Sequence, residues 1–407
     1  MVRFSYPEET LMSTAVSIDA DAELVSKLTD QLLAEFPRAT TDPATFLGAQ
    51  FDKGLAWVHF DVGFGGLAMA PKAQSVIDAK LRAAGAPSPV GRNPIGHGMG
   101  APTIHSWGSP EQRSRYLRPL FTGEEVWCQL FSEPGAGSDV AGLATKAIKD
   151  GDEWIVNGQK VWTTVAHLAK WGMLVARTDP DAEKHKGLTY FVVDMKGPGV
   201  EVRPLRQMTG DAEFNEVYFT DARVPDIERL GDRGDGWRVA LTTLMNERVS
   251  IGGAIAPRGS GPIGQAVDAY RKDPDPSKLD QLMSLWCRAE TGRLTNLRAS
   301  ANRKVGNPGP EGSTAKLAMA ELNKQIYEFA VGLMGPSGML YSDYNHRGAG
   351  TGMFTNDVQR SFLRSRANSI EGGTSEVMRN ILGERVLGLP GDVRVDKGRS
   401  WLEVPRN

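Results

Sequence analysis

The sequence changes character at Trp127-Cys-Gln-Leu-Phe-Ser-Glu-Pro-Gly-Ala-Gly-Ser-Asp139. Apolar residues give way there to a turn rich in glycine and serine, and a run of β-rich segments follows. Backbone amides freed by the glycines, together with a serine hydroxyl, are suited to hold a cofactor or a phosphate. A tight turn without a ligand explains the same residues, so this motif alone leaves both interpretations open.

The residues after this motif predict strands. The segment from Trp154 to Thr164 places Asn157-Gly158 between two β-rich runs, which predicts a hairpin that turns at these two residues. Further strands are predicted at Leu188–Asp194, Val200–Pro204 and Glu216–Thr220. Because Gly, Pro and Asp turns separate these runs, we expect a small antiparallel sheet or barrel as a middle domain over residues 126–235.

Helical patterns lie on both sides of this region. Before it, three leucines recur on one face of a predicted helix from Ser17 to Phe36, within a helical domain of residues 1–125. After it, residues 236–407 predict a helical bundle, and the polar tail beyond Pro390 is predicted to be peripheral. The expected fold class is therefore α+β. The apolar stripes are Leu24, Leu28 and Leu32; Ala240, Leu244, Glu247 and Ile251; and Leu322, Ile326, Phe329 and Leu333.

Composition excludes several classes of partner. The 407 residues include 47 Lys and Arg against 49 Asp and Glu, so no global field draws the chain to nucleic acid or to an anionic membrane. The two cysteines, Cys128 and Cys287, form no CxxC pair. The first residues lack the apolar run of a signal peptide, and no apolar run is long enough to cross a bilayer. We expect a cytoplasmic protein.

Common ligand motifs are weak or missing. Residues 259–264 match GxGxxG, but they follow a helical pattern rather than a strand, which predicts a flexible connection instead of a dinucleotide loop. The six histidines show no local metal-ligand spacing, so no metal site is expected.

Three further segments carry a family resemblance together with the opening motif. They are Gln159-Lys-Val-Trp-Thr-Thr164, Ile370-Glu-Gly-Gly-Thr-Ser-Glu376 and Glu384-Arg-Val-Leu-Gly-Leu389. With the specific Glu-Pro-Gly-Ala-Gly-Ser-Asp string, the chain resembles the acyl-CoA dehydrogenase family from about His97 to Pro390. The resemblance implies a helical N-terminal domain, a middle β domain and a C-terminal four-helix bundle, assembled as a tetramer or dimer.

The resemblance also implies a reaction. Members of the family bind FAD, oxidise an acyl-CoA thioester to its trans-2-enoyl form in lipid metabolism such as β-oxidation, and pass electrons to an electron-transfer flavoprotein. By position, the residues expected to contact FAD are Gln129, Phe131, Ser132, Gly137, Ser138, Trp162, Thr164, Arg303, Thr374 and Glu376. Those expected to contact the substrate are Ser138, Arg248 and Gly372, the last through its backbone N–H.

The catalytic base departs from the usual family pattern. Most members place a Glu before the Gly-Thr of the C-terminal motif, where this chain has Gly372. Glu247, directly before Arg248 on a predicted helix, matches the base of isovaleryl- and long-chain-type members, and its apolar stripe predicts a buried position. Glu371 is the alternative base. A carboxylate shielded from water suits the task because the α-proton of a thioester is weakly acidic.

A second departure concerns the adenosine half of the cofactor. In Asn302-Arg-Lys-Val-Gly-Asn-Pro-Gly-Pro-Glu-Gly312 the family's aromatic residue and following Gln are missing, and Gly332–Gly338 replaces a Gln-x-x-Gly-Gly-x-Gly segment. The alternatives are therefore a subunit of a heteromeric enzyme that shares a FAD site with a partner, a non-catalytic acyl-CoA-binding homologue, and a related flavin enzyme that activates oxygen.

Overall fold

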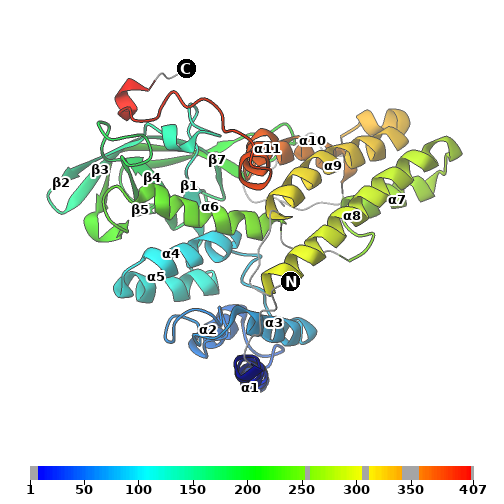
Figure 1. The fold of residues 1–407 in the computed structure, drawn as a ribbon, viewed down its shortest axis with the longest axis horizontal. Coiled ribbons are helices and arrows are strands. Elements are labelled where there is room, and N and C mark those ends of the chain that lie inside the picture. The colour runs from blue at the N-terminus through cyan, green and yellow to red at the C-terminus, as the bar shows by residue number, and fades with distance from the viewer. Residues whose placement is uncertain (1–7, 253–256, 305–310, 342–356, 405–407) are drawn as a thin grey trace, which may run out of the picture. The chain divides into compact units, whose positions relative to one another are not determined.

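A computed structural model describes residues 8–252, 257–304, 311–341 and 357–404 (Figure 1). The chain divides into two compact units, Met1–Trp127 and Cys128–Asn407. The helices of the first unit are α1 (Glu8–Glu35), α2 (Pro43–Asp52), α3 (Gln74–Ala83), α4 (Ala101–Trp107) and α5 (Pro110–Thr122). The sequence boundaries at 125/126 and 235/236 remain predictions.

Helix α1 confirms the predicted N-terminal helix but not its buried face. Val25, Thr29 and Leu32 are fully buried, whereas Leu24 is 44% exposed. The buried stripe includes a threonine, whose hydroxyl donates to the Val25 carbonyl at 2.6 Å and so needs no other acceptor. A pattern built from leucines alone therefore shifted the predicted face by part of a turn.

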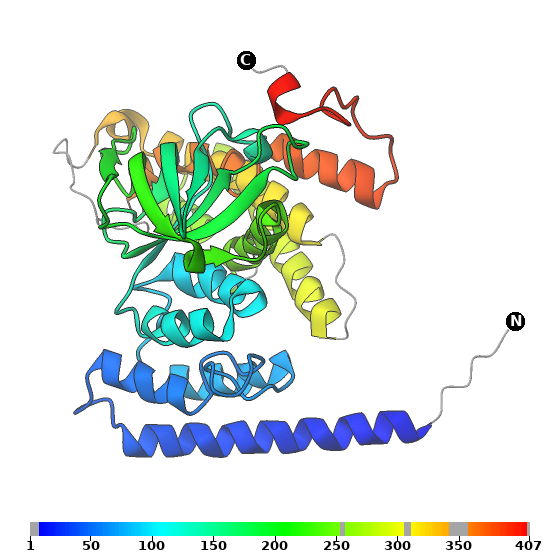
Figure 2. The same cartoon turned by 90° about the vertical axis from the view of Figure 1, so that its left-hand side faces the viewer.

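The second unit begins with a curved sheet (Figures 1 and 2). Its strands are β1 (Trp127–Leu130), β2 (Lys146–Asp150), β3 (Glu153–Thr164), β4 (Trp171–Arg177), β5 (Leu188–Asp194), β6 (Val200–Leu205), β7 (Phe214–Pro225) and β8 (Arg229–Leu230). The hydrogen-bonded order is β6-β7-β3-β2-β4-β5-β8, with β1 beside β4. The described pairings are antiparallel except β2 with β4, which confirms the predicted middle β domain.

The predicted hairpin at Asn157-Gly158 is wrong. Strand β3 runs straight through both residues, and the chain reverses earlier, between Asp150 and Glu153. The register against β7 shifts between Val156 and Gly158, which marks a β-bulge. A Cβ at Gly158 would lie 2.4 Å from the Thr145 hydroxyl oxygen, so close packing of neighbouring strands, and not a turn, requires glycine there.

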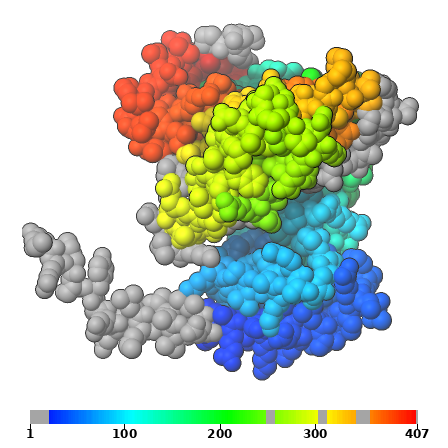
Figure 3. Space-filling view, turned by 90° about the vertical axis from the view of Figure 1, so that its right-hand side faces the viewer, coloured from blue at the N-terminus to red at the C-terminus, as the bar shows by residue number. Residues whose placement is uncertain are grey.

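Helices complete the second unit and confirm the predicted C-terminal helical domain. They are α6 (Gly236–Gly252), α7 (Pro262–Lys272), α8 (Leu279–Lys304), α9 (Glu311–Leu333), α10 (Val358–Ser365) and α11 (Ser375–Ile381). The stripe of α9 packs against α7 and α8 through a shared apolar core. Figure 3 shows α7 and α8 at the surface of this helical domain. Residues 259–261 precede α7, but residues 262–264 form its first turn, so only the first half of this segment is a connection.

Most of the described C-terminal tail is exposed, as the sequence predicts, but Trp401 is an exception. Trp401 is 8% exposed, and its indole N–H donates to the Gly142 carbonyl at 3.2 Å. The Arg177 guanidinium lies 4.4 Å from the centre of its ring. Hydrophobicity alone did not reveal this contact because a single aromatic residue in a polar tail forms no periodic pattern.

One negative observation concerns membranes. Among the helices in the described ranges, none combines the length and the apolar character needed to cross a bilayer.

Candidate active site

Ser132 and Trp162 lie side by side at the heart of the site. The Val161 N–H donates to the Ser132 carbonyl at 2.9 Å, which joins the glycine-rich turn to β3. The register of β3 against β7 shifts between Lys160 and Thr163, so Trp162 sits on a bulge with φ +61°. Its indole is 56% exposed and meets the Phe214 ring edge-on at 5.8 Å. A large aromatic face is thus held open in a strained backbone.

A buried ion pair between Lys160 and Glu133 holds the glycine-rich turn in place. The Lys160 ammonium, fully buried, lies 2.8 Å from the Glu133 carboxylate and donates to the Phe131 carbonyl at 3.0 Å. The other donors to Glu133 are the amides of Ala144 and Thr145. Burial lowers the pKa of Lys160. Burial also works to raise the pKa of Glu133, but the Lys160 charge and the hydrogen bonds outweigh it, so that pKa falls below its ordinary value.

The turn itself presents open backbone. Gly137 and Ser138 are exposed, and a Cβ placed at Gly135 or Gly137 would meet no atom within 4 Å. The Asp139 carboxylate at the end of the turn lies 3.1 Å from the Lys184 ammonium. This open backbone beside an exposed indole suits a ligand that has both a flat ring and phosphates.

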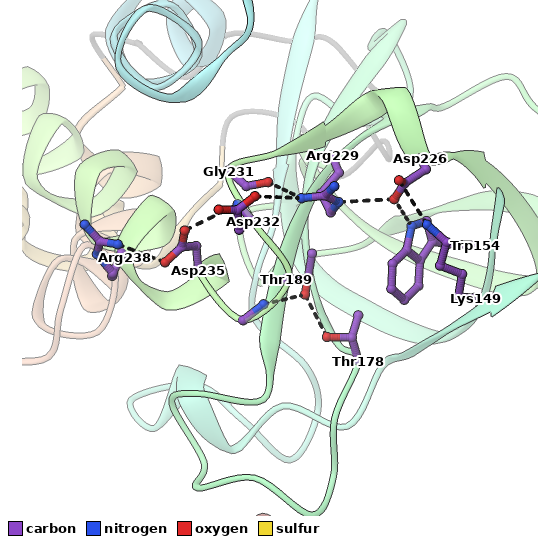
Figure 4. A network of polar contacts seen from close by, with 11 residues as sticks. Lys149, Trp154, Thr178, Thr189, Asp226, Arg229, Gly231, Asp232, Asp235 and Arg238 are labelled. Carbon is purple, nitrogen blue, oxygen red and sulfur yellow. Dashed lines mark hydrogen bonds and ion pairs between the residues drawn. The ribbon is translucent and has the colours of Figure 1, made fainter. Parts of the chain in front are cut away.

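Helix α6 is anchored to the sheet by its first turns (Figure 4). The Gly234 N–H donates to the Thr189 hydroxyl at 3.2 Å, and Arg238 pairs with Asp235 at 2.9 Å. A Cβ at Gly236 would lie 2.5 Å from the Thr189 nitrogen, so the close approach of α6 to β5 requires glycine.

The same helix carries Glu247 on its packed face. Val239, Ala240 and Thr243 are fully buried, and the Thr243 and Tyr190 hydroxyls lie 3.0 Å apart. Glu247 follows Thr243 by one helical turn and is half-buried, whereas its place on the apolar stripe predicts a buried position.

The segment after α10 forms a glycine turn. Gly372 and Gly373 adopt φ +62° and +94°, a left-handed conformation that favours glycine. Within the described parts of the chain, the N–H of Gly372 donates to no protein acceptor. Its neighbour Glu371 receives both guanidinium nitrogens of Arg364, at 2.8 and 3.1 Å, and the Asn368 amide at 2.8 Å. Both oxygens of Glu371 are therefore engaged.

One aromatic ring connects the two halves of the site. The Arg364 guanidinium carbon lies 5.7 Å from the centre of the Phe214 ring, and Phe214 also contacts Trp162. Since Arg364 holds Glu371, a continuous chain of contacts leads from the exposed indole to the glycine turn. The structure thus brings these two sequence motifs together.

The remaining expected site residues are placed as follows. Gln129 and Thr164 are half-buried on β1 and β3, and Phe131 is buried with its ring 5.9 Å from that of Tyr190. The Thr374 hydroxyl caps α11 by accepting from the Val377 N–H at 3.1 Å, and Glu376 is exposed. Arg248 and Arg303 belong to α6 and α8, but their side chains lie outside the described residues.

The sequence did not point to three cations that hold the site: Lys160, Arg364 and Lys316. A signal existed for Lys160, because a lysine stands where the buried alternation of Trp154 and Val156 continues along β3. Arg364 and Lys316 gave no comparable signal. Their partners lie on other elements, and sequence spacing does not show such contacts.

Family models match all three parts of the chain. They are the acyl-CoA dehydrogenase N-terminal domain over residues 18–124, the middle domain over residues 128–222 and the C-terminal domain over residues 234–387. Together they cover most of the sequence.

Two curated relatives come from Mycobacterium tuberculosis. The chain is 41% identical to acyl-CoA dehydrogenase FadE34 over 346 residues, which is 83% of this chain but only 45% of that protein. It is 37% identical to acyl-CoA dehydrogenase IpdE1, covering 84% of this chain and 86% of the relative. The chain thus spans less than half of one relative and most of the other.

Solved structures share the fold. The Tcur3481–Tcur3483 steroid ACAD matches with a TM-score of 0.69 at 24% identity, covering 92% of this chain and 98% of that one. The ChsE4–ChsE5 complex from Mycobacterium tuberculosis matches with a TM-score of 0.67 at 25% identity, covering 96% and 100%. On its sequence and its three matched domains, the chain belongs to the acyl-CoA dehydrogenase family.

Proposed function

We propose that this chain is a FAD-dependent acyl-CoA dehydrogenase that forms a trans-2-enoyl-CoA and passes electrons to an electron-transfer flavoprotein. The observation that carries the proposal is Trp162, an exposed indole in a strained bulge beside Ser132. A backbone outlier that exposes a large aromatic ring marks a ligand-binding position.

The residues present fit FAD. Trp162 and Thr164 flank the place proposed for the ring, and the open turn suits its phosphates. FAD, when bound, supplies the two-electron acceptor for the oxidation. The full proposed cofactor set is Gln129, Phe131, Ser132, Gly137, Ser138, Trp162, Thr164, Arg303, Thr374 and Glu376.

Glu247 is the proposed base. It takes the α-proton of the thioester, while the N–H of Gly372 donates to the thioester oxygen as negative charge develops there. The free N–H of Gly372, noted for the described residues, suits that role. Glu371 suits the role of base poorly, because Arg364 and Asn368 hold its oxygens. Arg248 and Ser138 are proposed to contact the substrate.

The substrate class is an acyl-CoA thioester, and its acyl group is open to test. Straight-chain and branched thioesters belong in the panel. One structural neighbour is described as a steroid ACAD, so a steroid side-chain thioester belongs there too. We further propose that the protein is cytoplasmic and works as an oligomer.

The test is flavin bleaching under anaerobic conditions. We expect the purified protein to carry FAD and to lose its flavin absorbance when the right acyl-CoA is added. In Glu247→Gln, FAD remains bound but the rate of bleaching falls by about 10²–10⁴-fold, the usual contribution of a general base. Glu371→Gln is the comparison: it weakens the pair with Arg364 that holds the turn, so we expect its rate to fall about tenfold, well short of the loss in Glu247→Gln.

Two outcomes contradict parts of the proposal. Full bleaching in Glu247→Gln together with loss in Glu371→Gln would move the base to Glu371. A wild-type protein that binds acyl-CoA but is not bleached by any member of the panel would favour a non-catalytic homologue. Rapid reoxidation of the reduced flavin by air would favour an oxygen-activating enzyme.

A heteromeric enzyme is the second candidate. It is favoured by the altered Asn302–Gly312 segment and by the neighbour solved as a ChsE4–ChsE5 complex. In that case this chain lends part of a FAD site to a related partner. Flavin content of the chain purified alone separates the two candidates, because one FAD per chain disfavours a shared site.

A further inference from the structure

Lys316 is a buried cation that the proposed mechanism leaves without a role. It lies on α9, and the residue is 3% exposed. Its ammonium group donates to the Asn368 carbonyl at 2.9 Å and also to the Gly373 carbonyl. A buried ammonium is costly unless its donors are satisfied, so these two bonds fix both carbonyls firmly.

The two carbonyls bracket the turn that carries Gly372. Asn368 precedes Gly372 by four residues and Gly373 follows it directly. Both glycines have positive φ, and such a turn is easily deformed because glycine restricts its backbone little. Because the Lys316 ammonium group bonds to a carbonyl at each end of the segment, it limits the directions in which the intervening N–H groups can point.

Carboxylates from four elements act on the same ammonium group. They are Glu371 in the turn, Glu321 on α9, Glu247 on α6 and Glu376 on α11. Glu247 is the proposed base, and its helix α6 packs against α9, which carries Lys316.

We propose that Lys316 is a positioning residue of the active site: it clamps the turn that presents the Gly372 N–H, and its charge stabilises the ionised form of Glu247. This inference rests on the proposed function. Coulomb attraction is mutual, so an ammonium that senses the Glu247 charge favours the carboxylate form of Glu247 to the same extent. Lys316 thus supports both Glu247, which accepts the proton, and the Gly372 N–H, which donates to the thioester oxygen.

The balance of charges on Lys316 supports this role. Burial lowers the pKa of Lys316, and Glu371, Glu321, Glu247 and Glu376 act in the opposite direction, with the net effect downward. Loss of the ammonium would remove its attraction from every one of these carboxylates. Among these carboxylates Glu247 is the proposed base, so the consequence for catalysis falls on Glu247.

The test compares pH profiles of kcat/KM for wild type, Lys316→Met and Lys324→Met. The acidic limb of this profile reports the base in the free enzyme. We expect Lys316→Met to move that limb upward by about one pH unit, and so to lower kcat/KM about tenfold at pH values below the limb. Lys324→Met is the matched control on the same helix and leaves the limb in place. If the acidic limb of Lys316→Met coincides with that of the wild type, the proposed charge role of Lys316 is overturned.

A second measurement tests the clamp without activity. Hydrogen–deuterium exchange of residues 368–374 is followed by mass spectrometry in the three proteins with FAD bound. We expect exchange in this peptide to become about tenfold faster in Lys316→Met and to stay unchanged in Lys324→Met, because the carbonyls lose their donor. Unchanged exchange in Lys316→Met overturns the clamp.

A third variant keeps the proposal testable if Lys316→Met does not fold. Lys316→Arg retains the charge, so we expect its acidic limb to match the wild type while kcat falls; a shifted limb in this variant overturns the charge role. Failure of the wild-type protein to be bleached by any thioester would defeat the proposed function instead, and the exchange experiment would still test the clamp.

Discussion

The two halves of the active site are held by different means. On the β side, Glu133 and Lys160 form a pair that is almost fully buried, with side chains 8% and 0% exposed, inside one sheet domain. On the helical side, Arg364 and Glu371 are 16% and 31% exposed and hold a glycine turn. Arg364 also lies 3.5 Å from the Glu213 carboxylate, whose side chain is 5% exposed. The platform proposed for FAD thus rests on an almost fully buried ion pair, whereas the turn proposed for the reacting atoms rests on a pair that is only partly buried.

This difference has a functional meaning. Desolvated ion pairs are strongly destabilising to break, whereas half-exposed pairs contribute little to stability. We therefore expect mutations on the β side to affect folding first and mutations on the helical side to affect catalysis first.

The largest expected effect comes from Lys160→Met. It leaves the buried Glu133 carboxylate without its cation, which lowers the free energy of unfolding by about 3–5 kcal/mol. Urea unfolding followed by circular dichroism measures the loss. Lys149→Met is the matched control, because Lys149 is 47% exposed where it pairs with Asp226, and that change lowers stability by less than about 1 kcal/mol. Equal losses of unfolding free energy in Lys160→Met and Lys149→Met would contradict the expected difference between buried and exposed ion pairs.

A smaller effect on stability is expected from Arg364→Gln. This change breaks the bidentate pair with Glu371 and the contact with the Phe214 ring, and it lowers the free energy of unfolding by about 1–2 kcal/mol. Because the turn loses its support, kcat for acyl-CoA oxidation falls about tenfold while FAD stays bound.

The control for this change is Arg379→Gln, which removes an exposed pair with Glu376. It should leave both stability and kcat near the wild-type values. If Arg364→Gln destabilised the protein as much as Lys160→Met, the helical side would be as much a part of the core as the β side.

The smallest effect concerns acid. The pKa of Glu133 in the folded protein lies below the ordinary value of 4.5, so the unfolded chain binds its proton first as pH falls. The resulting stability is fully present above pH 4.5 and is lost as pH falls through the folded-state pKa. Between pH 5 and 3, where this stability is lost, Glu133→Gln should reduce the total change in unfolding free energy by about 1 kcal/mol. An identical pH dependence of the unfolding free energy in the wild type and in Glu133→Gln would contradict this prediction.

Local patterns predicted much of this architecture. The strand at Leu188–Asp194 has the predicted bounds, and the stripe of Leu322, Ile326 and Phe329 is buried as expected. In both cases one face of a regular element meets the core, so periodicity carries the information.

The errors share a different cause, which is contact between distant parts of the chain. Asn157 bonds to Asp221, and Gly158 is confined by Thr145, so partners outside the local sequence turned an apparent hairpin into a bulge. The cofactor motif was visible because its residues are contiguous. The cations that support it were not, since Lys316 meets the Asn368 carbonyl 52 residues away.

The bond from Trp401 to Gly142 joins residues 259 positions apart. Contacts between residues so far apart in the sequence form slowly, so we expect this one to form late in folding. During synthesis on the ribosome, the sheet emerges long before the residue that seals its Gly142 corner, and until then Arg177 lacks the aromatic ring it later covers. The Gly142 corner of the sheet is therefore completed only after Trp401 has been made.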